Sequence, residues 1–587
     1  VRHGEFHSPE EGPGTLDVLD RGLLRASQAA RGETPWRNQF GVTVAQAYRS
    51  RVDGSVQPYS VTYPADYLKD PRKKWRLDVV LHGRDATLTE VKFLHQHDGR
   101  QQAAAAQDYV QLDVYGRGNN GYRWAGETDV WEALNNFLGV EQALGRDGSL
   151  DLNRIMLRGF SMGGAGTWQI GLHRPDVWCC LGPGAGFVTT HGFVKDLPEK
   201  LPAYQEACLH IYDAADYAEN AFNVPVVAYG GSKDPQLQAA RTMEERFKPL
   251  HIPMTLLEAP GLAHSFPPEW QKKAQQEYAK HGGGDQGNRD YPEHVKYVTY
   301  TLRYGNCFWV EVLGLDRHYE RALVDARKTE EGFTVKTTNV RALRLGVPAG
   351  SPGPLTVDMD GQAVPTRPYL DQNGSLHVYL ERRGDRWQAV FPQKLLTNRM
   401  RHLQKTAGLQ GPIDDAFMDS FLCVRGTGKP WHAATQKYAE ANLKRFQQEW
   451  NLYLRGDLPV KDDAEVTEDD IARKHLILFG DPSSNSVLGQ VVDSLPLEWT
   501  RDHITLDDRT YSAAEHVPVL IYPSPLNPNR YVVVNSGHTF HDTEFRGSNA
   551  LLFPRLGDYA ILKLASSDKD PLAVATVTAG LFDDSWK

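Results

Sequence analysis

Short apolar runs alternate with segments of helical spacing in the first half of the chain. Continuous apolar runs predict buried strands in "WRLDVVLHG", "DYVQLDVYG" and "LNRIMLRGF", and later in "VPVVAYGG" and "PMTLLEAPG". Between the last two, "PQLQAARTMEERFKPL" has the spacing of an amphipathic helix. Strands that alternate with helices are typical of a mostly parallel sheet covered by helices on both faces. The pattern therefore predicts an α/β domain.

Two runs of alternating apolar and polar residues, "GVTVAQAYRS" and "SVQPYSVTYP", flank Asp53-Gly54. This dipeptide between such runs predicts a β-hairpin. Before it, residues 15–31 predict a short amphipathic helix, with Thr15 as its cap and Gly32 as its stop. We therefore assign residues 1–35 to an N-terminal helical extension and residues 36–284 to the α/β domain.

The pattern changes after the breaker run "HGGGDQGNRDYP". Between residues 295 and 390, short β-rich runs recur with turn residues between them, which predicts a sandwich-like β domain over 285–391. Beyond it, a long helical segment at 431–454 precedes the apolar runs "VPVLIYPSPLN", "YVVVNSG" and "YAILKLA". We interpret residues 392–587 as a third, smaller α/β domain.

Composition narrows the class of protein without changing this picture. The chain has 587 residues, of which 40% are hydrophobic, and a net charge of −9. An acidic balance argues against a nucleic-acid partner, because such proteins present a basic face. No apolar run reaches the length of about 18 residues that a membrane span needs, so none is expected.

The chain begins at Val1 rather than Met, which fits either a removed signal peptide or a trimmed start. Because a removed signal peptide would direct the protein out of the cytoplasm, we expect a secreted or periplasmic protein. The five cysteines are few and odd in number, and they lack the spacing of a disulfide framework or a zinc site. We therefore expect no metal and no cofactor, and the sequence leaves a homo-oligomer open.

The pentapeptide Gly159-Phe160-Ser161-Met162-Gly163 fits G-x-S-x-G. It follows a predicted strand and begins a predicted helix, which is the context in which such a serine sits on a sharp turn with its hydroxyl exposed. The N–H of Met162 would then stand at a helix N-terminus, where it can donate to an oxyanion. The sequence favours Ser161 as a nucleophile over an ordinary serine in a glycine-rich loop.

A serine nucleophile needs a base and an acid that orients the base. Asp234 follows the strand "VPVVAYGG", and His264 follows the next strand, "MTLLEAPG". Both loops are expected at the carboxyl edge of the sheet, where sites of open α/β sheets lie. We therefore predict Asp234 as the acid and His264 as the base. Asp213 and Asp216 are the rival acids, but they precede the wrong strand.

The second oxyanion donor is expected in "VVLHGRD", from the N–H of Gly83 or Arg84. His82 either orients that loop or is packed without a chemical role. Further along, the aromatic and polar segment 115–134 either lines a substrate pocket or is pinned by packed aromatics. The pocket candidates are Tyr122, Trp124 and Glu127 from this segment, and Phe187 and His191 from the stretch between the serine and the acid.

The motifs "LHGR", "GFSMGGAGTW", "GGSKDP" and "GLAHSF" resemble the α/β-hydrolase superfamily, in its prolyl-oligopeptidase-like and esterase branch. The segment from about residue 41 to 280 is similar to secreted bacterial feruloyl esterases, acetylxylan esterases and polyhydroxyalkanoate depolymerases. The resemblance implies the same triad and oxyanion donors. Peptidases of this kind usually carry an N-terminal β-propeller, whereas the extra domains here lie C-terminal. This difference favours an esterase over a peptidase.

We therefore expect a serine carboxylesterase that acts through an acyl-enzyme on a small-molecule or polymer-linked ester, with polysaccharide-linked or aromatic acyl groups as the substrate class. Two alternatives stay open. A prolyl-oligopeptidase-like peptidase would use the same triad, and a catalytically silent binding protein would keep the fold for its surface.

Overall fold

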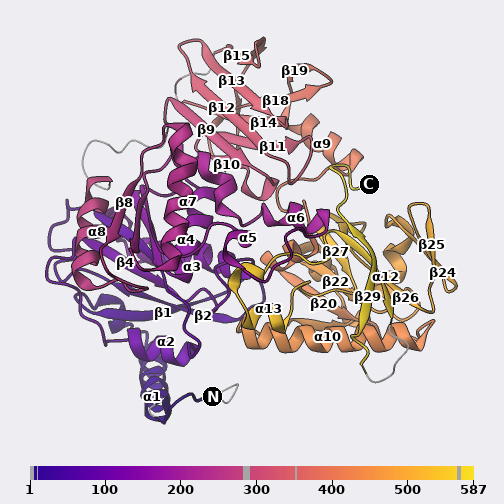
Figure 1. The fold of residues 1–587 in the computed structure, drawn as a ribbon, viewed down its shortest axis with the longest axis horizontal. Helices are drawn as coiled ribbons and strands as arrows, with labels where there is room; N and C mark the ends of the chain where they lie inside the picture. The colour runs from indigo at the N-terminus through magenta and orange to yellow at the C-terminus, as the bar shows by residue number, and fades with distance from the viewer. Residues whose placement is uncertain (1–4, 10, 282–290, 349, 351–352, 565–569) are drawn as a thin grey trace.

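The computed structural model describes residues 5–9, 11–281, 291–348, 350, 353–564 and 570–587. The expected boundary between residues 284 and 285 lies outside them. The described residues form three main β regions, which Figure 1 shows as an indigo-to-magenta part, a β-rich part at the top and an orange-to-yellow part. The fold class expected from the sequence is confirmed: an α/β-hydrolase sheet is followed by a β sandwich and a second α/β sheet.

The first sheet has eight strands in the order β1-β2-β4-β3-β5-β6-β7-β8. Its strands are β1 (Thr43–Arg49), β2 (Val56–Thr62), β3 (Trp75–Leu81), β4 (Tyr109–Val114), β5 (Leu150–Phe160), β6 (Cys180–Gly184), β7 (Val227–Gly231) and β8 (Thr255–Ala259). The hairpin predicted around Asp53-Gly54 joins β1 to β2. From β4 to β8 every neighbouring pair is parallel, so these strands end at one edge.

The two faces of this sheet bury different side chains, because successive strand residues point to opposite sides. Ile155 and Leu157 of β5 join the large core beneath α3 (Ala125–Ala143) and α4 (Met162–His173). Met156, between them, joins a separate cluster with Tyr278 of α8 (Pro268–His281). Helices therefore cover both faces, as the sequence predicts. The remaining helices of this part are α2 (Glu90–His97), α5 (Thr190–Phe193), α6 (Ala203–Leu209) and α7 (Gln238–Phe247).

Strand β6 has no strand signal in the sequence. Its residues read Cys-Leu-Gly-Pro-Gly, and glycine and proline are depleted in strands. Glycine is tolerated in β6 because the turn between β5 and α4, which carries Ser161, lies directly against this strand. A Cβ on Gly184 would stand 2.9 Å from the ring of Phe160, and one on Gly164 would stand 2.1 Å from the Gly184 carbonyl oxygen. Close approach of backbones, rather than β propensity, decides this strand.

The β-rich part is a sandwich of two sheets that share one core. One sheet has the order β10-β11-β14-β18-β17, with β19 beside β18, and the other has the order β16-β15-β13-β12-β9. The strands are β9 (His294–Thr299), β10 (Asn306–Cys307), β11 (Val310–Leu315), β12 (Ala322–Lys328), β13 (Gly332–Thr338), β14 (Val340–Val347), β15 (Leu355–Met359), β16 (Gln362–Thr366), β17 (Tyr369–Leu370), β18 (Leu376–Arg383) and β19 (Arg386–Ala389).

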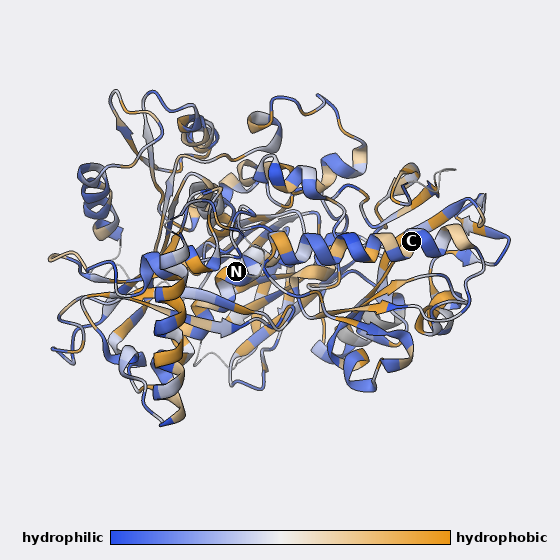
Figure 2. Cartoon of the chain, turned by 90° about the horizontal axis from the view of Figure 1, so that it is seen from below, coloured by the Kyte–Doolittle hydropathy of each residue, from blue (hydrophilic) through white to orange (hydrophobic). Residues whose placement is uncertain are grey.

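The last part is built on a seven-stranded sheet of order β21-β20-β22-β27-β26-β28-β29, beside a small sheet β23-β24-β25. Its long helix α10 (Ala433–Tyr453) runs lengthwise in Figure 2, with polar and apolar residues alternating along it. The strands are β20 (Phe421–Arg425), β21 (Val460–Asp462), β22 (His475–Phe479), β23 (Glu498–Trp499), β24 (His503–Leu506), β25 (Arg509–Ser512), β26 (His516–Ser524), β27 (Asn527–Val534), β28 (Tyr559–Leu564) and β29 (Val574–Gly580). The shorter helices are α9 (Pro392–His402), α11 (Glu468–Arg473), α12 (Ser486–Val491) and α13 (Asp542–Arg546).

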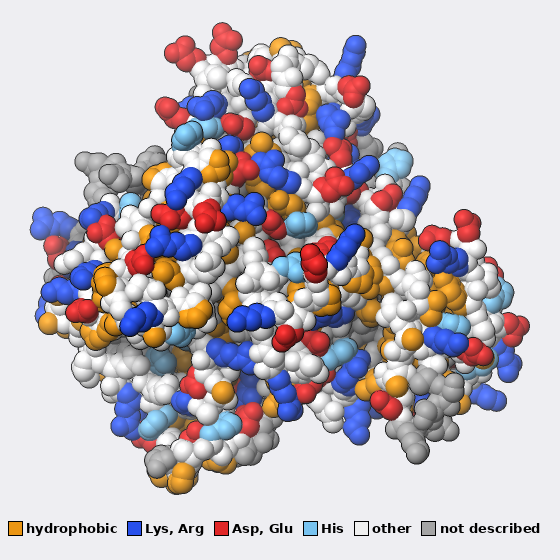
Figure 3. All heavy atoms as spheres, in the orientation of Figure 1, with side chains coloured by type: hydrophobic (Ala, Val, Ile, Leu, Met, Phe, Trp, Pro, Cys, Tyr) orange, Lys and Arg blue, Asp and Glu red, His pale blue; other side chains and the backbone are white. Residues whose placement is uncertain are grey.

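The N-terminal helix α1 (Glu11–Ala30) begins earlier than the cap at Thr15 predicts. It lies against α2, and Arg25 fastens it by an ion pair of 2.6 Å to Asp98. Acidic and basic side chains are interspersed over the face of the molecule in Figure 3, without a block of one sign. Among the described residues, no helix is both long and apolar enough to cross a bilayer.

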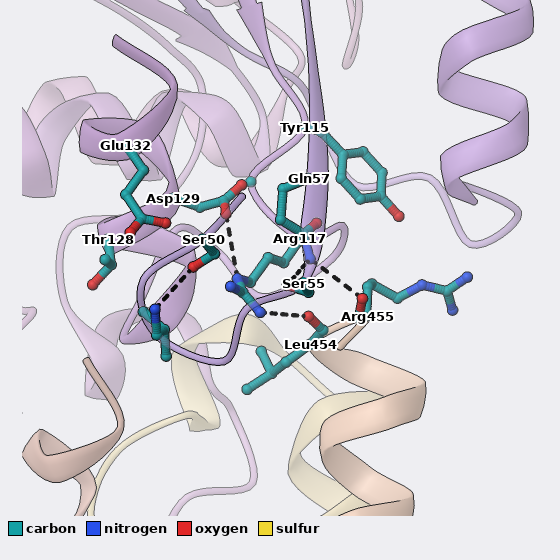
Figure 4. Close-up of polar contacts among 12 residues, drawn as sticks. Ser50, Ser55, Gln57, Tyr115, Arg117, Thr128, Asp129, Glu132, Leu454 and Arg455 are labelled. Atoms are coloured by element: carbon teal, nitrogen blue, oxygen red, sulfur yellow. Dashed lines mark hydrogen bonds and ion pairs between the residues drawn. The ribbon is translucent and has the colours of Figure 1, made fainter. Parts of the chain in front are cut away.

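A buried ionic network around Arg117 in the first part of the chain contacts the end of α10 in the last part (Figure 4). Its guanidinium forms two hydrogen bonds to Asp53, of 2.8 and 3.1 Å, and donates to the Leu454 carbonyl oxygen at 3.0 Å. Burial opposes ionisation of Asp53, but Arg117 outweighs it and holds the pKa of Asp53 below its usual value. Burial also raises the pKa of Asp129, which lies 3.3 Å from Arg117, to about 7. One hydrophobic core continues across this contact.

Candidate active site

Ser161 sits on a strained turn between β5 and α4. Its φ of 61° and ψ of −118° lie outside the regions that non-glycine residues favour. Two glycines make the turn sterically feasible. A Cβ on Gly159 would stand 2.4 Å from the Gly163 carbonyl oxygen, and one on Gly163 would stand 2.0 Å from the Leu81 carbonyl oxygen. The G-x-S-x-G spacing is thus set by contacts of the elbow with itself and with β3.

The loops after β7 and β8 bring the predicted acid and base to this serine. His264 Nε2 lies 2.8 Å from Ser161 Oγ, and His264 Nδ1 lies 2.7 Å from Asp234 Oδ2. The two loops are tied to each other, because the Gly261 N–H donates to Ser232 Oγ at 2.8 Å. The structure therefore brings together all three side chains of the expected triad.

The environment of the pair differs at its two ends. The Asp234 side chain is 1% exposed, and its other oxygen accepts the Gln236 N–H at 2.9 Å. The His264 side chain is 38% exposed. Its ring lies against Phe160, with centroids 4.7 Å apart. A buried carboxylate thus orients a ring that stays accessible on its outer side, which suits a general base.

Two backbone N–H groups beside Ser161 are free to stabilise negative charge. A Cβ on Gly83 would stand 3.5 Å from the Ser161 Cβ, so the loop after β3 passes next to the nucleophile. Neither the Gly83 nor the Arg84 N–H meets an acceptor among the residues that the structure describes. Met162 is the first residue of α4, and the first N–H groups of a helix lack a partner within it.

The His82 side chain connects this loop to the end of β4. Its Nδ1 lies 2.8 Å from the Gly83 carbonyl oxygen and its Nε2 2.9 Å from the Tyr115 carbonyl oxygen. A neutral imidazole donates from one nitrogen only. Burial disfavours the doubly protonated ring and lowers the pKa of His82. Of the two roles open for His82, the structure thus shows contacts of the orienting kind.

Tyr122, Trp124 and Glu127 do not line an open pocket, and this corrects the expectation from the sequence. Tyr122 is fully buried and donates to the His82 carbonyl oxygen at 3.1 Å. Trp124 Nε1 donates to the Leu552 carbonyl oxygen at 2.9 Å. Glu127 accepts from the hydroxyls of two buried tyrosines, and burial raises its pKa. Residues of the last part that lie outside its sheet contact this segment, and its second half is part of α3, so it is pinned by packing.

Phe187 and His191 contact residues of the first part of the chain around α4 and α6. Phe187 stacks on Phe193, with ring centroids 4.6 Å apart, and packs with Ala165 one turn into α4. His191 forms an ion pair with Glu206 at 3.1 Å. The rival acids are engaged elsewhere. Asp213 accepts the Thr190 N–H, and Asp216 lies 2.6 Å from His210.

Sequence reasoning missed the segment 545–552, which lies against the active-site edge. In Figure 1, α13 is drawn beside α5 of the first part, and the segment after α13 contacts α5. Arg84 donates to the Gly547 carbonyl oxygen at 2.6 Å, and Ala550 packs with Phe187. No motif marks these residues, and nothing local to them signals a partner more than 400 positions away.

The arrangement suits nucleophilic acyl transfer, with a serine, a base, an orienting acid and two backbone donors. Among the described residues, no group of three or more histidine, cysteine, aspartate or glutamate side chains is placed to hold a metal. All five cysteines are buried.

A model of the prolyl oligopeptidase family matches residues 95–294. No curated protein matches the sequence significantly. Similar solved structures include a ferulic acid esterase, at 17% identity and a TM-score of 0.30, covering 42% of this chain and 98% of that one. They also include an S-formylglutathione hydrolase from Agrobacterium tumefaciens, at 18% identity and a TM-score of 0.33, covering 42% and 98%. A third similar structure is dipeptidyl peptidase 4 of Porphyromonas gingivalis, at 16% identity and a TM-score of 0.31. The match covers 40% of this chain and 35% of that one.

The sheet, the serine elbow and the match over residues 95–294 lead to one conclusion. The first sheet and its serine turn form an α/β-hydrolase domain in which residues 95–294 match the model of the prolyl oligopeptidase family, and the protein is a serine hydrolase.

Proposed function

We propose that the protein is a carboxylesterase that cleaves esters through an acyl-enzyme on Ser161. The hydrogen-bond chain from Asp234 through His264 to Ser161 carries the proposal, because a neutral serine is a weak nucleophile without such a chain. Ser161 Oγ attacks the acyl carbonyl carbon, and its proton passes to His264 Nε2. Asp234 stabilises the imidazolium that forms.

The tetrahedral intermediate places its negative oxygen between the N–H groups of Met162 and Gly83. It collapses as the ester C–O bond breaks, and His264 gives its proton to the departing alcohol. Water then attacks the acyl-enzyme and passes a proton to His264. The carboxylic acid leaves, Ser161 recovers its proton, and the reaction needs no redox partner or further reactant.

An ester is favoured over an amide by the openness of the site. The His264 ring is 38% exposed, so water reaches the group that must protonate the leaving atom. An alcohol departs with less assistance from a proton donor than an amine does. The open side also admits an acyl group that is attached to a polymer, which supports the polysaccharide-linked class of substrate.

The stacked pair Phe187–Phe193 supports an aromatic acyl group. Phe187 is nearly buried against α4, whereas Phe193 is exposed, so the pair presents an apolar ring face beside α4, the helix that begins after Ser161. Flat aromatic groups stack on such a face with offset or tilted geometry. We therefore place the acyl chain of the substrate on this side of Ser161.

A panel of substrates tests the proposal. The enzyme should turn over acetyl and feruloyl esters, free and attached to a polysaccharide, with a higher kcat/KM than peptide anilides of matched size. Phe193→Ala should raise KM for feruloyl esters and leave acetyl esters unchanged. A peptidase is the second candidate, because the matching family is named for an oligopeptidase. Higher kcat/KM for the peptide anilides would establish it in place of the esterase.

A further inference from the structure

Arg84 joins the oxyanion loop to the far end of the chain. Its Nη1 donates to the Gly547 carbonyl oxygen at 2.6 Å, and its Nη2 donates to those of Arg546 and Phe545 at 2.9 and 3.4 Å. These three carbonyls lie at the C-terminal end of α13, where a helix has no N–H groups of its own to offer them. A cation there is also favoured by the helix dipole.

A second connection runs from the neighbouring residue. The Asp85 N–H donates to Asn119 Oδ1 at 3.1 Å, and Asn119 Nδ2 donates to the Asp85 carbonyl oxygen at 2.7 Å. The Asn119 carbonyl oxygen in turn accepts from Asn549 Nδ2 at 2.8 Å. Residues 84 and 85 are therefore both linked to the segment 545–549 of the last domain.

Gly83 lies between these links and the His82 contacts, and it has no side chain that could anchor it. It lies against the nucleophile, because a Cβ on it would meet the Phe160 carbonyl oxygen at 3.3 Å and the Ser161 Cβ at 3.5 Å. Its N–H position is therefore set by how its two neighbours are held. His82 is fixed by the first domain, and Arg84 by the last domain.

We propose that Arg84 is a positioning residue that holds the Gly83 N–H in place through α13, so that the C-terminal domain completes the oxyanion hole. The inference rests on the proposed function in that Gly83 is taken as an oxyanion donor. It assigns to the C-terminal domain a part in catalysis, because the Arg84 side chain touches no reacting atom and acts through its neighbour.

The size of the effect follows from what the donor contributes. Removing one oxyanion donor costs about 10²–10³ in kcat. A loop that is loosened rather than lost should cost part of this, on the order of 10- to 100-fold in kcat. KM should change by less than about threefold, because an interaction that is made mainly in the transition state leaves KM nearly unchanged.

Three variants of the full chain test this. Arg84→Met removes every hydrogen-bond donor of the side chain and keeps a similar volume, whereas Arg84→Lys keeps one charged donor group. Arg72→Met is the control, since the Arg72 side chain is 91% exposed. Two rates are measured, namely kcat for p-nitrophenyl acetate and the rate at which a fluorophosphonate labels Ser161. We expect both rates to fall for Arg84→Met, to recover partly for Arg84→Lys, and to stay at the wild-type value for Arg72→Met.

A fourth variant tests the route through α13. The Phe545 ring stacks on Tyr453 at 4.4 Å and holds α13 without touching the first domain's triad. Phe545→Leu should slow both rates, and the double variant with Arg84→Met should be no slower than Arg84→Met alone. Multiplying effects would overturn the proposal, as would rates of Arg84→Met within about threefold of wild type. If Arg84→Met does not fold, Phe545→Leu decides by the same threshold.

The two readouts separate this inference from the function it rests on. A wild-type protein that labels with the fluorophosphonate but hydrolyses no ester would contradict the proposed esterase, while the labelling rates of the variants would still decide the role of Arg84. A wild-type protein that neither labels nor hydrolyses would overturn both.

Discussion

The His264 ring lies 2.8 Å from the hydroxyl of Ser161, a residue 103 positions earlier in the chain. Nothing in local sequence holds the two together. They meet because β5 and β8 end at the same edge of one parallel sheet, and because Asp234, on the loop between them in the chain, fixes the far side of the ring at 2.7 Å. The contact between these side chains is thus a consequence of sheet topology.

Replacement of the acid tests its role in that contact. Asp234→Asn should lower kcat for p-nitrophenyl acetate by about 10⁴, because the amide donates where the carboxylate accepts and holds the wrong tautomer of His264. KM should change little. Asp216→Asn is the matched control, since Asp216 also lies 2.6 Å from a histidine, His210, away from the serine. Equal losses for the two variants would contradict the assignment of Asp234.

The elbow glycines give a steric prediction. Gly163→Ala should abolish activity and lower the melting temperature, because its Cβ would stand 2.0 Å from the Leu81 carbonyl oxygen, which is a backbone atom of β3. Gly139→Ala, in α3 with nothing within 4 Å, should instead stabilise the protein by about 0.5–1 kcal/mol. Thermal unfolding and esterase assays of both variants measure the contrast. An active Gly163→Ala protein would refute the steric account of the elbow.

The Arg117 network predicts a large loss of stability. Arg117→Met should lower the free energy of unfolding by about 3–5 kcal/mol, because it leaves Asp53 and Asp129 buried without their cation. Arg51→Met is the control, as its side chain is 66% exposed and should contribute less than about 1 kcal/mol. Denaturant unfolding monitors both. A loss for Arg117→Met as small as the control's would contradict the role of Arg117 as the cation of these two buried carboxylates.

Asp78 predicts a pH dependence of stability. It is fully buried, yet the charges of Arg76 and Arg158 outweigh burial and hold the pKa of Asp78 below its usual value. A carboxyl whose pKa is lower in the folded state stabilises the protein above its unfolded pKa of about 3.9, and this stabilisation is lost as the pH falls. The difference in unfolding free energy between wild type and Asp78→Asn should therefore be larger at pH 6 than at pH 2. A difference that does not vary with pH would contradict the ionic account.

The elements that the sequence predicts are those whose signals are local. The elbow and the loops of Asp234 and His264 each follow an apolar run directly, so strand order alone places them at one edge. The prediction that Tyr122 and Trp124 line a pocket was wrong because their surroundings come from a distant part of the chain. Tyr122 and Trp124 have the composition of a binding loop, and only the covering segment around Leu552, more than 400 residues later, makes them interior.

Arg84 also has a contact that no local sequence pattern predicts. The sequence marks its backbone as a candidate donor, whereas the structure gives its side chain a separate task on α13. Strand β6 was missed because its glycines are required by the close approach of Phe160 to Gly184 and of Tyr278 to Gly182, rather than by strand propensity. Contacts between distant parts of the chain, which no local pattern encodes, account for both.

The central claim is that Ser161 is the nucleophile of an ester hydrolase. The most direct test is turnover of p-nitrophenyl acetate by Ser161→Ala, with folding checked by thermal unfolding. We predict a kcat lower than wild type by on the order of 10⁶, since removal of the nucleophile leaves only the oxyanion donors and binding. Turnover near the wild-type rate in a folded Ser161→Ala protein would contradict the account.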